Sequence, residues 1–246
     1  MHGQLILSVG MPRAGSGWHY NLIHDLLAVS DGQDARKIRT RYHLSLFLTE
    51  VNCNISTLKP NRLLPVLLPT VFGNTFAVKT HAGPTDISDQ LIKSGRIRAT
   101  YIYRDPRAAL LSAYEYGQKA IAKSQSNAFS QLKTLDQAAA FMEQYVGIWE
   151  AWIVREDVLK VKYEILVQDY EQEAIHLGNF LGVDLSQPAI NAILEKYRPE
   201  QGDRAQKGTH FSQGQAERFR KIFTSEELEK FTHRFAKYLI RMGYDL

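Results

Sequence analysis

LILSVGMPRAGSGW, residues 5–18, is the stretch of sequence that decides the fold. It opens with an apolar run at 5–10 that is typical of a buried strand, and it leads into a helical spacing of apolar residues that starts at Trp18. A turn rich in glycine joins the two patterns. Such a turn directs backbone N–H groups and the helix dipole at one point. The stretch therefore predicts a phosphate-binding loop.

Three similar runs of apolar and β-branched residues follow, at 76–81, 99–105 and 158–164. Nearly continuous apolar strands are typical of a parallel sheet that is covered on both faces. Helical periodicity and helix-starting residues predict helices at 18–27, 106–114, 136–153, 169–181, 188–197 and 224–241. We therefore predict an α/β fold, a single domain over residues 1–246 with a central parallel β-sheet flanked by helices on both faces. The mixed segment 31–75 is expected to be an insertion over the sheet.

The composition excludes several classes of protein. The 246 residues carry 30 Lys and Arg against 26 Asp and Glu, a net charge of +4 that is too small for a nucleic-acid coat. Cys53 is the only cysteine, so the chain has no intramolecular disulfide and no cysteine-rich zinc site. The longest apolar stretch, 63–72, is too short to cross a bilayer, and the run at 5–9 lacks the flanks of a signal peptide. We expect a cytoplasmic protein with no transmembrane segment and no nucleic-acid partner.

The glycine spacing matches only the first half of a nucleoside-triphosphate loop. Gly10 and Gly15 have that spacing, but Ser16 stands where a triphosphatase has its lysine. Gly17 stands where it has the hydroxyl that holds magnesium. These differences disfavour a kinase or nucleotidase, which remains the alternative enzyme class. The cation of this loop is Arg13. An alternative to the phosphate-binding loop is that the glycines only form a tight turn between strand and helix.

Residues 12–18 resemble the first signature, approximately PKSGTTW, of the sulfotransferases that use 3′-phosphoadenosine 5′-phosphosulfate (PAPS). Four further segments resemble that family in the same order along the chain: the Lys-Thr-His segment at 79–81, Arg104 followed by Ser112, a strand that leads to Tyr163, and Gln206-Lys207-Gly208. Each segment alone is a weak signal, but unrelated proteins seldom place all five in order. The resemblance implies that the loop is a P-loop-like phosphosulfate-binding loop.

The resemblance also implies the donor and its contacts. PAPS would be the donor, and adenosine 3′,5′-bisphosphate (PAP) would be the product. Arg104 and Ser112 would hold the 3′-phosphate, Lys207 and Gly208 would close over it, and Tyr163 would contact adenine beside Trp18. The phosphosulfate would lie on the loop formed by Pro12, Arg13, Ala14, Gly15, Ser16, Gly17 and Trp18.

The implied reaction is an in-line transfer of a sulfuryl group that requires no metal. Arg13 and Lys79 would stabilise the charge on the bridging oxygen that leaves. His81 would accept the proton of the acceptor, because the new bond forms as that proton comes off. Glu115, one helical turn after Ser112, is the alternative base.

The sequence departs from the family at several of these positions, including Gly17, which lacks the second hydroxyl, and the loop after His81, which is one residue longer. Arg13 replaces the usual lysine, which preserves the charge but changes the shape of the group. Gln206 replaces an arginine, so Lys207 and Arg204 are left to complete the 3′-phosphate site. Both aromatic residues of the expected adenine site would equally suit a hydrophobic core.

These observations predict a sulfotransferase that acts on a hydroxyl, with an amine as the second choice, of a small-molecule, lipid or glycan acceptor. A non-catalytic nucleotide-binding module is a third interpretation. The family's dimer motif is degenerate at 220–229, so the sequence leaves open a monomer and a weak homodimer. The basic run at 35–41 is either a solvated face or a docking patch for an acidic acceptor. We expect 31–75 and 115–135 to set acceptor specificity.

Overall fold

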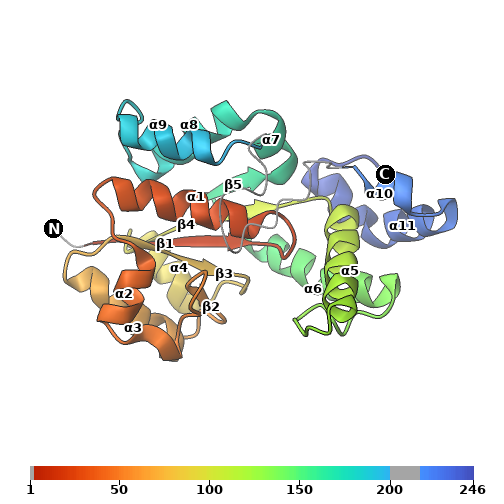
Figure 1. Ribbon diagram of the computed structural model, residues 1–246, viewed down its shortest axis with the longest axis horizontal. Coiled ribbons are helices and arrows are strands. Elements are labelled where there is room, and N and C mark those ends of the chain that lie inside the picture. The colour runs from red at the N-terminus through yellow and green to blue at the C-terminus, as the bar shows by residue number, and fades with distance from the viewer. Residues whose placement is uncertain (1–2, 200–216) are drawn as a thin grey trace.

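The computed structural model describes residues 3–199 and 217–246. Its centre is a five-stranded sheet in the order β2-β3-β1-β4-β5, and every pairing in it is parallel (Figure 1). The strands are β1 (Leu5–Gly10), β2 (Asn54–Ile55), β3 (Phe76–Thr80), β4 (Ile97–Tyr103) and β5 (Val158–Lys162). Helices cover both faces, so the predicted single-domain α/β class is confirmed.

The central strand explains why the sequence shows continuous apolar runs. Every residue of β1 is buried, because the strand has neighbours on both sides and helices above and below. Leu5 is level with Phe76 of β3 and with Ile97 of β4. Parallel pairing brings the carboxyl ends of β1, β3, β4 and β5 to one edge of the sheet. That edge is where ligands bind in open α/β sheets.

The helices form one layer on each face of the sheet, and a further group of helices packs around α5 (Figure 1). One face carries α1 with α8 and α9, the other carries α4 and α6, and α5 packs with α6, α10 and α11 beyond the end of β4. The bounds are α1 (Ser16–Val29), α4 (Asp86–Lys93), α5 (Pro106–Ala122), α6 (Leu135–Ile153), α7 (Tyr163–Gln168), α8 (Tyr170–Leu181), α9 (Pro188–Lys196), α10 (Phe219–Ile222) and α11 (Ser225–Met242). Among the described helices, none combines the length and the apolar character that crossing a bilayer needs.

Helix caps determine where several of these elements begin. Thr224 and Glu227 form a capping box before α11, and Thr85 with Ser88 forms a second one before α4. Asp105 caps α5 by accepting a hydrogen bond from the backbone N–H of Arg107. Because Asp105 directly follows Arg104, this cap also fixes the end of β4 at the site.

One predicted boundary near β5 was wrong, and one short helix was not predicted. The strand ends at Lys162 instead of continuing to 164, and Tyr163 begins the short helix α7. The predicted helix at 169–181 is α8, a separate element that follows directly. The change from strand to helix at Tyr163 places its ring next to Gly15, in the loop that follows β1.

The segment 31–75 folds as α2 (Ala35–Arg41), the 3-10 turn η1 (Leu44–Leu46), β2 and α3 (Pro60–Val71). The stretch with repeated prolines is helical. Pro60 occupies the first turn, where no N–H is needed, whereas Pro65 and Pro69 lie inside the helix. The basic run is not simply a solvated face. Arg36 Nε donates to the Val51 carbonyl at 3.0 Å, and Arg39 Nε donates to the Leu48 carbonyl at 2.9 Å.

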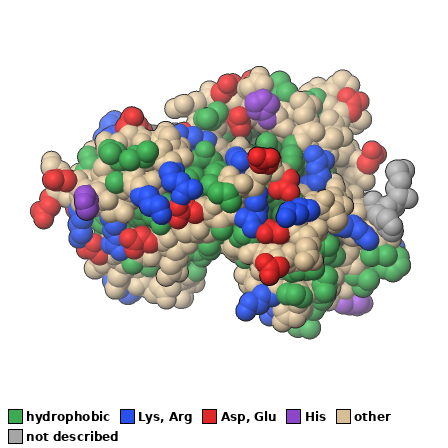
Figure 2. Space-filling model, turned by 180° about the vertical axis from the view of Figure 1, so that it is seen from behind, with side chains coloured by type: hydrophobic (Ala, Val, Ile, Leu, Met, Phe, Trp, Pro, Cys, Tyr) green, Lys and Arg blue, Asp and Glu red, His purple; other side chains and the backbone are tan. Residues whose placement is uncertain are grey.

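Charges of both signs are intermixed on the surface shown in Figure 2. Lys and Arg side chains lie among Asp and Glu side chains, so this face carries no broad field of one sign. The positive charge of the binding site therefore comes from individual side chains and not from a broad basic surface on this face.

Candidate active site

The loop after β1 is held in a conformation that depends on glycine. Gly15 has φ +77° and precedes α1, and Arg13 has φ +64°, also in the left-handed region. A Cβ on Gly15 would lie 2.8 Å from Cδ2 of Tyr163. The Tyr163 ring therefore packs directly beneath the loop, and only glycine leaves it room.

The loop opens onto a cavity of about 220 Å³ at the carboxyl edge of the sheet. Most of the predicted site residues meet there: Pro12, Arg13, Gly15, Ser16, Gly17, Trp18, Lys79, His81, Arg104, Ser112 and Tyr163. Ala14 is fully buried and is not among the lining residues, so any contact that it makes with the donor would come from its backbone. Lys207 and Gly208, with Arg204 and Gln206, lie outside the described residues.

Three lining residues were absent from the prediction: Asn52, Tyr116 and Phe129. Tyr116 lies four residues after Ser112 on α5, so helical spacing alone could have indicated it. Asn52 and Phe129 lie outside helices and strands, where periodicity gives no signal. Only the tertiary structure brings them to the cavity.

Arg13 is oriented by neighbours from α5. Its Nε donates to Oγ of Ser112 at 3.2 Å, and its Cζ lies 4.3 Å from the centroid of the Tyr116 ring. Burial lowers the pKa of Arg13, which the Tyr116 phenol partly opposes. Ser112, predicted to touch a phosphate, here accepts a hydrogen bond from the loop cation.

Lys79 and His81 extend from the end of β3 on the other side of the loop. Burial, and then the charge of Arg13, lower the pKa of Lys79 to about 8. Burial, and then the charge of Lys79, lower the pKa of His81 to about 3, so its ring is neutral at pH 7. Nδ1 of His81 lies 2.6 Å from the Gly10 carbonyl, which can only accept. The proton is therefore on Nδ1, and Nε2 keeps the lone pair that a base needs.

Arg104 and Glu115 occupy different environments. Cζ of Arg104 lies 4.4 Å from the centroid of the Tyr163 ring, and Nη1 donates to the Arg13 carbonyl at 3.5 Å. Glu115 forms an ion pair with Arg218 and is not among the lining residues of the cavity. Of the two candidate bases, His81 is the one that lines the cavity.

The chain matches the family model described as "Sulfotransferase domain" over residues 4–243. It belongs to the sulfotransferase domain family. The rabbit (Oryctolagus cuniculus) protein named amine sulfotransferase is 24% identical over 194 residues, which are 62% of this chain and 61% of the relative. The chain therefore spans less than two thirds of that relative's length.

Two solved structures have a similar fold. Mouse sulfotransferase SULT7A1, complexed with PAP, has a TM-score of 0.61 at 15% identity and covers 97% of this chain and 85% of its own. Retinol dehydratase, in a complex with retinol and PAP, has a TM-score of 0.64 at 16% identity and covers 100% and 83%. At these identities the likeness concerns the fold alone.

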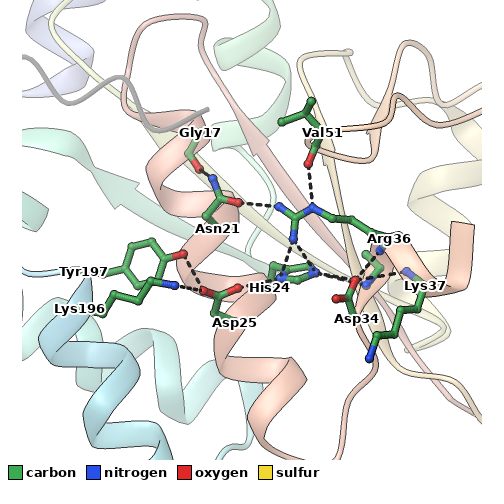
Figure 3. Close-up of polar contacts among 11 residues, drawn as sticks. Gly17, Asn21, His24, Asp25, Asp34, Arg36, Lys37, Val51, Lys196 and Tyr197 are labelled. Carbon is green, nitrogen blue, oxygen red and sulfur yellow. Dashed lines mark hydrogen bonds and ion pairs between the residues drawn. The ribbon is translucent and has the colours of Figure 1, made fainter. Parts of the chain in front are cut away.

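A polar network of α1, Arg36 and Lys196 lies beside the loop that follows β1 (Figure 3). Nδ2 of Asn21 donates to the Gly17 carbonyl at 2.9 Å, and Nη2 of Arg36 donates to Oδ1 of Asn21 at 3.1 Å. The same guanidinium donates to the carbonyl of Val51, the residue before Asn52. Arg36 thus joins the first turn of α1 to the segment that carries Asn52.

Asp25 anchors the other half of this network (Figure 3). It accepts from Nζ of Lys196 and from the Tyr197 hydroxyl, each at 2.8 Å, and lies 2.9 Å from Nδ1 of His24. Burial alone would raise the pKa of Asp25, but these hydrogen bonds outweigh it and hold the pKa below its ordinary value. The Tyr197 carbonyl also accepts from Nε1 of Trp18 at 3.0 Å. The network therefore connects the end of α9 to Trp18, which lines the cavity.

Proposed function

We propose that this protein transfers the sulfuryl group of PAPS to a hydroxyl or amine of a small-molecule, lipid or glycan acceptor and releases PAP. One observation carries the proposal: Arg13, Lys79 and Arg104 line the same cavity as the neutral base His81. The described residues that line it include no carboxylate. Such a cavity suits a polyanionic donor and an acceptor that must lose a proton.

The donor would lie along the carboxyl edge of the sheet. The phosphosulfate lies on the backbone N–H groups at the start of α1, and its negative charge faces Arg13 and Lys79. Arg104 binds the 3′-phosphate, and Tyr163 contacts the adenine. The two solved structures described above are complexes with PAP, which supports this assignment.

The transfer would be a single in-line displacement. The acceptor oxygen or nitrogen forms a bond to sulfur, and the bond from sulfur to the bridging oxygen of PAPS breaks. The bridging oxygen leaves with PAP and its charge is stabilised by Arg13 and Lys79. The proton of the acceptor passes to Nε2 of His81. Atoms and charge balance without a further reactant.

The compartment and the assembly state belong to the same proposal. The single buried Cys53 and the absence of disulfides among the described residues fit a reducing cytoplasm. We further propose a monomer or weak homodimer that binds no nucleic acid. The mixed charges on the face shown in Figure 2 fit the second of these proposals.

A thermal-shift comparison of PAP with ATP plus magnesium tests the proposed donor. PAP at about one hundred times its dissociation constant should stabilise the protein by ~2.7 kcal/mol, and EDTA should not alter that shift. Sulfur-35 transfer from labelled PAPS to a panel of acceptors then tests the reaction. Stabilisation by ATP with magnesium and not by PAP would instead identify a kinase or nucleotidase. PAP binding without any transfer would identify a non-catalytic module.

A further inference from the structure

The helix α3 carries a stripe of large apolar side chains on its exposed face. Four residues form this α3 stripe: Leu64, Leu68, Val71 and Phe72. Their spacing places them on one side of the helix, and the other side of α3 packs into the core. Apolar side chains of this size that stay exposed as a group are typical of a surface that meets a partner.

Contacts at the two ends of α3 place a basic side chain near each end of the stripe. The Phe72 ring lies 6.1 Å from the Tyr42 ring, centroid to centroid, and Cζ of Arg41 lies 5.7 Å from the centroid of that tyrosine. At the start of α3, Nη1 of Arg62 donates to the carbonyl of Leu46, a further exposed apolar residue. Apolar and basic side chains therefore share one surface.

The chain around the stripe has almost no negative charge. Residues 35–75 contain six Lys and Arg and one carboxylate, Glu50. Lys37 and Arg41 are exposed one helical turn apart on α2, and Lys59 is exposed directly before α3. The surface therefore suits a partner that is apolar inside and negatively charged outside.

A second copy of this chain does not have that chemistry. A symmetric contact would place the stripe and its cations against themselves, so Lys37 and Arg41 would face like charges. No Asp or Glu occurs in residues 51–85 to offset them. The stripe is also the ridge of an exposed helix, whereas peptide segments dock into grooves or along sheet edges. A lipid bilayer with anionic headgroups satisfies both the charge and the shape.

We propose that α3 docks this protein onto an anionic membrane surface. The helix lies in the plane of the interface with the stripe among the acyl chains, and Lys37, Arg41 and Lys59 face the lipid headgroups. In Figure 1, α2 and α3 lie at the end of the molecule opposite α5, α10 and α11, so those helices stay clear of the bilayer. Docking of this kind needs neither PAPS nor sulfuryl transfer, and it goes beyond the proposed function.

Cosedimentation of the full chain with vesicles tests the docking. Vesicles of phosphatidylcholine with about 30% phosphatidylserine should bind the protein at least roughly tenfold more tightly than vesicles of phosphatidylcholine alone. Raising the salt concentration from about 0.05 M to about 0.5 M should weaken this binding, because the ions screen the cations from the headgroups.

Two pairs of variants locate the surface. Phe72 is 66% exposed and Ile240, on α11, is 64% exposed, so neither Phe72→Gln nor Ile240→Gln opens the core. Phe72→Gln should lower the partition coefficient onto anionic vesicles roughly tenfold, and Ile240→Gln should leave it unchanged. Arg41→Gln should lower it about fivefold, whereas Lys237→Gln, which removes an exposed cation of α11, should not.

A tryptophan at position 72 supplies a signal that a loss of folding cannot imitate by loss of binding. Trp18, Trp149 and Trp152 are buried, so Phe72→Trp adds an exposed fluorophore. With anionic vesicles its emission should shift to shorter wavelength, and brominated acyl chains should quench it. Ile240→Trp should show neither effect. Circular dichroism of each variant establishes that it folds as the wild type does.

The possible outcomes decide between the partners. Equal binding to both kinds of vesicle, no binding to either, or an unchanged partition coefficient in Phe72→Gln overturns the proposal. Dimerisation that Phe72→Gln abolishes, without vesicle binding, assigns the stripe to a second copy. Salt-sensitive binding of poly-glutamate without vesicle binding assigns the surface to an acidic protein. All these measurements are made without PAPS or PAP, so failure of the proposed function leaves them unaffected.

Discussion

At the scale of single residues, the role of His81 depends on one hydrogen bond. The Gly10 carbonyl keeps the proton on Nδ1 and leaves Nε2 to accept another. His81→Ala should lower the single-turnover rate with saturating PAPS by roughly 10²–10⁴-fold and leave PAP affinity nearly intact.

The control for this prediction is Glu115→Gln. Because Glu115 is paired with Arg218 and does not line the cavity, its loss should leave the chemical step near normal. A near-normal rate in His81→Ala together with a collapse in Glu115→Gln would assign the base to Glu115 instead.

Arg104 has a different expected signature, since a 3′-phosphate lies far from the reacting sulfur. Arg104→Ala should weaken PAP binding by tenfold to a few hundredfold, because a hydrogen bond to a charged group contributes ~1.5–3 kcal/mol. Calorimetry with PAP and with adenosine 5′-phosphate, which lacks the 3′-phosphate, measures this. Equal losses for both nucleotides would show that Arg104 acts only on the fold of the loop, through Arg13 and Tyr163.

At the scale of elements, the junction of β1 and α1 requires glycine at residue 15. Gly15→Ala places a Cβ against the Tyr163 ring and a side chain at φ +77°, which should cost about 1–2 kcal/mol of stability or more and weaken PAP binding. Gly147→Ala on α6 is the control, because no atom lies within 4 Å of its added Cβ. It should gain up to about 1 kcal/mol. Chemical denaturation measures the free energy of unfolding of both variants. Equal values for the two variants would contradict the prediction.

At the scale of the whole molecule, buried histidines should make stability depend on pH. His19 is fully buried, its Nδ1 lies 3.2 Å from Oγ of Ser8, and burial lowers its pKa to about 3. Since its folded pKa is below the unfolded value of ~6.5, the unfolded chain binds the proton first. The stability it contributes is complete above pH 6.5 and is lost as the pH falls toward 3.

Urea unfolding between pH 7.5 and 5 tests this dependence. Below pH 6.5, His19 should contribute a slope of up to ~1.4 kcal/mol per pH unit, which His19→Gln removes. The exposed His233 is the control position, where His233→Gln should leave the slope unchanged. Identical slopes in the wild type and His19→Gln would contradict the prediction.

Much of the fold was predictable because its signals are local. Apolar runs at 5–10 and 76–81 became β1 and β3 nearly as predicted, and the capping box at Thr224 marked the start of α11. The boundary near Tyr163 was wrong because nothing in the neighbouring sequence shows that the ring must turn beneath Gly15. That constraint comes from the loop after β1, which is far from Tyr163 in the sequence.

The sequence by itself determined the parallel α/β architecture and the loop at 12–18, since alternation of strand and helix patterns and glycine spacing are properties of short stretches. It also supplied Lys79 and His81, which follow a recognisable strand. Only the tertiary structure decided that Asn52 faces the same cavity, that Glu115 is paired elsewhere and that Arg36 points inward. These are contacts between segments distant in sequence, and they depend on how strands order themselves in the sheet, which no local pattern records.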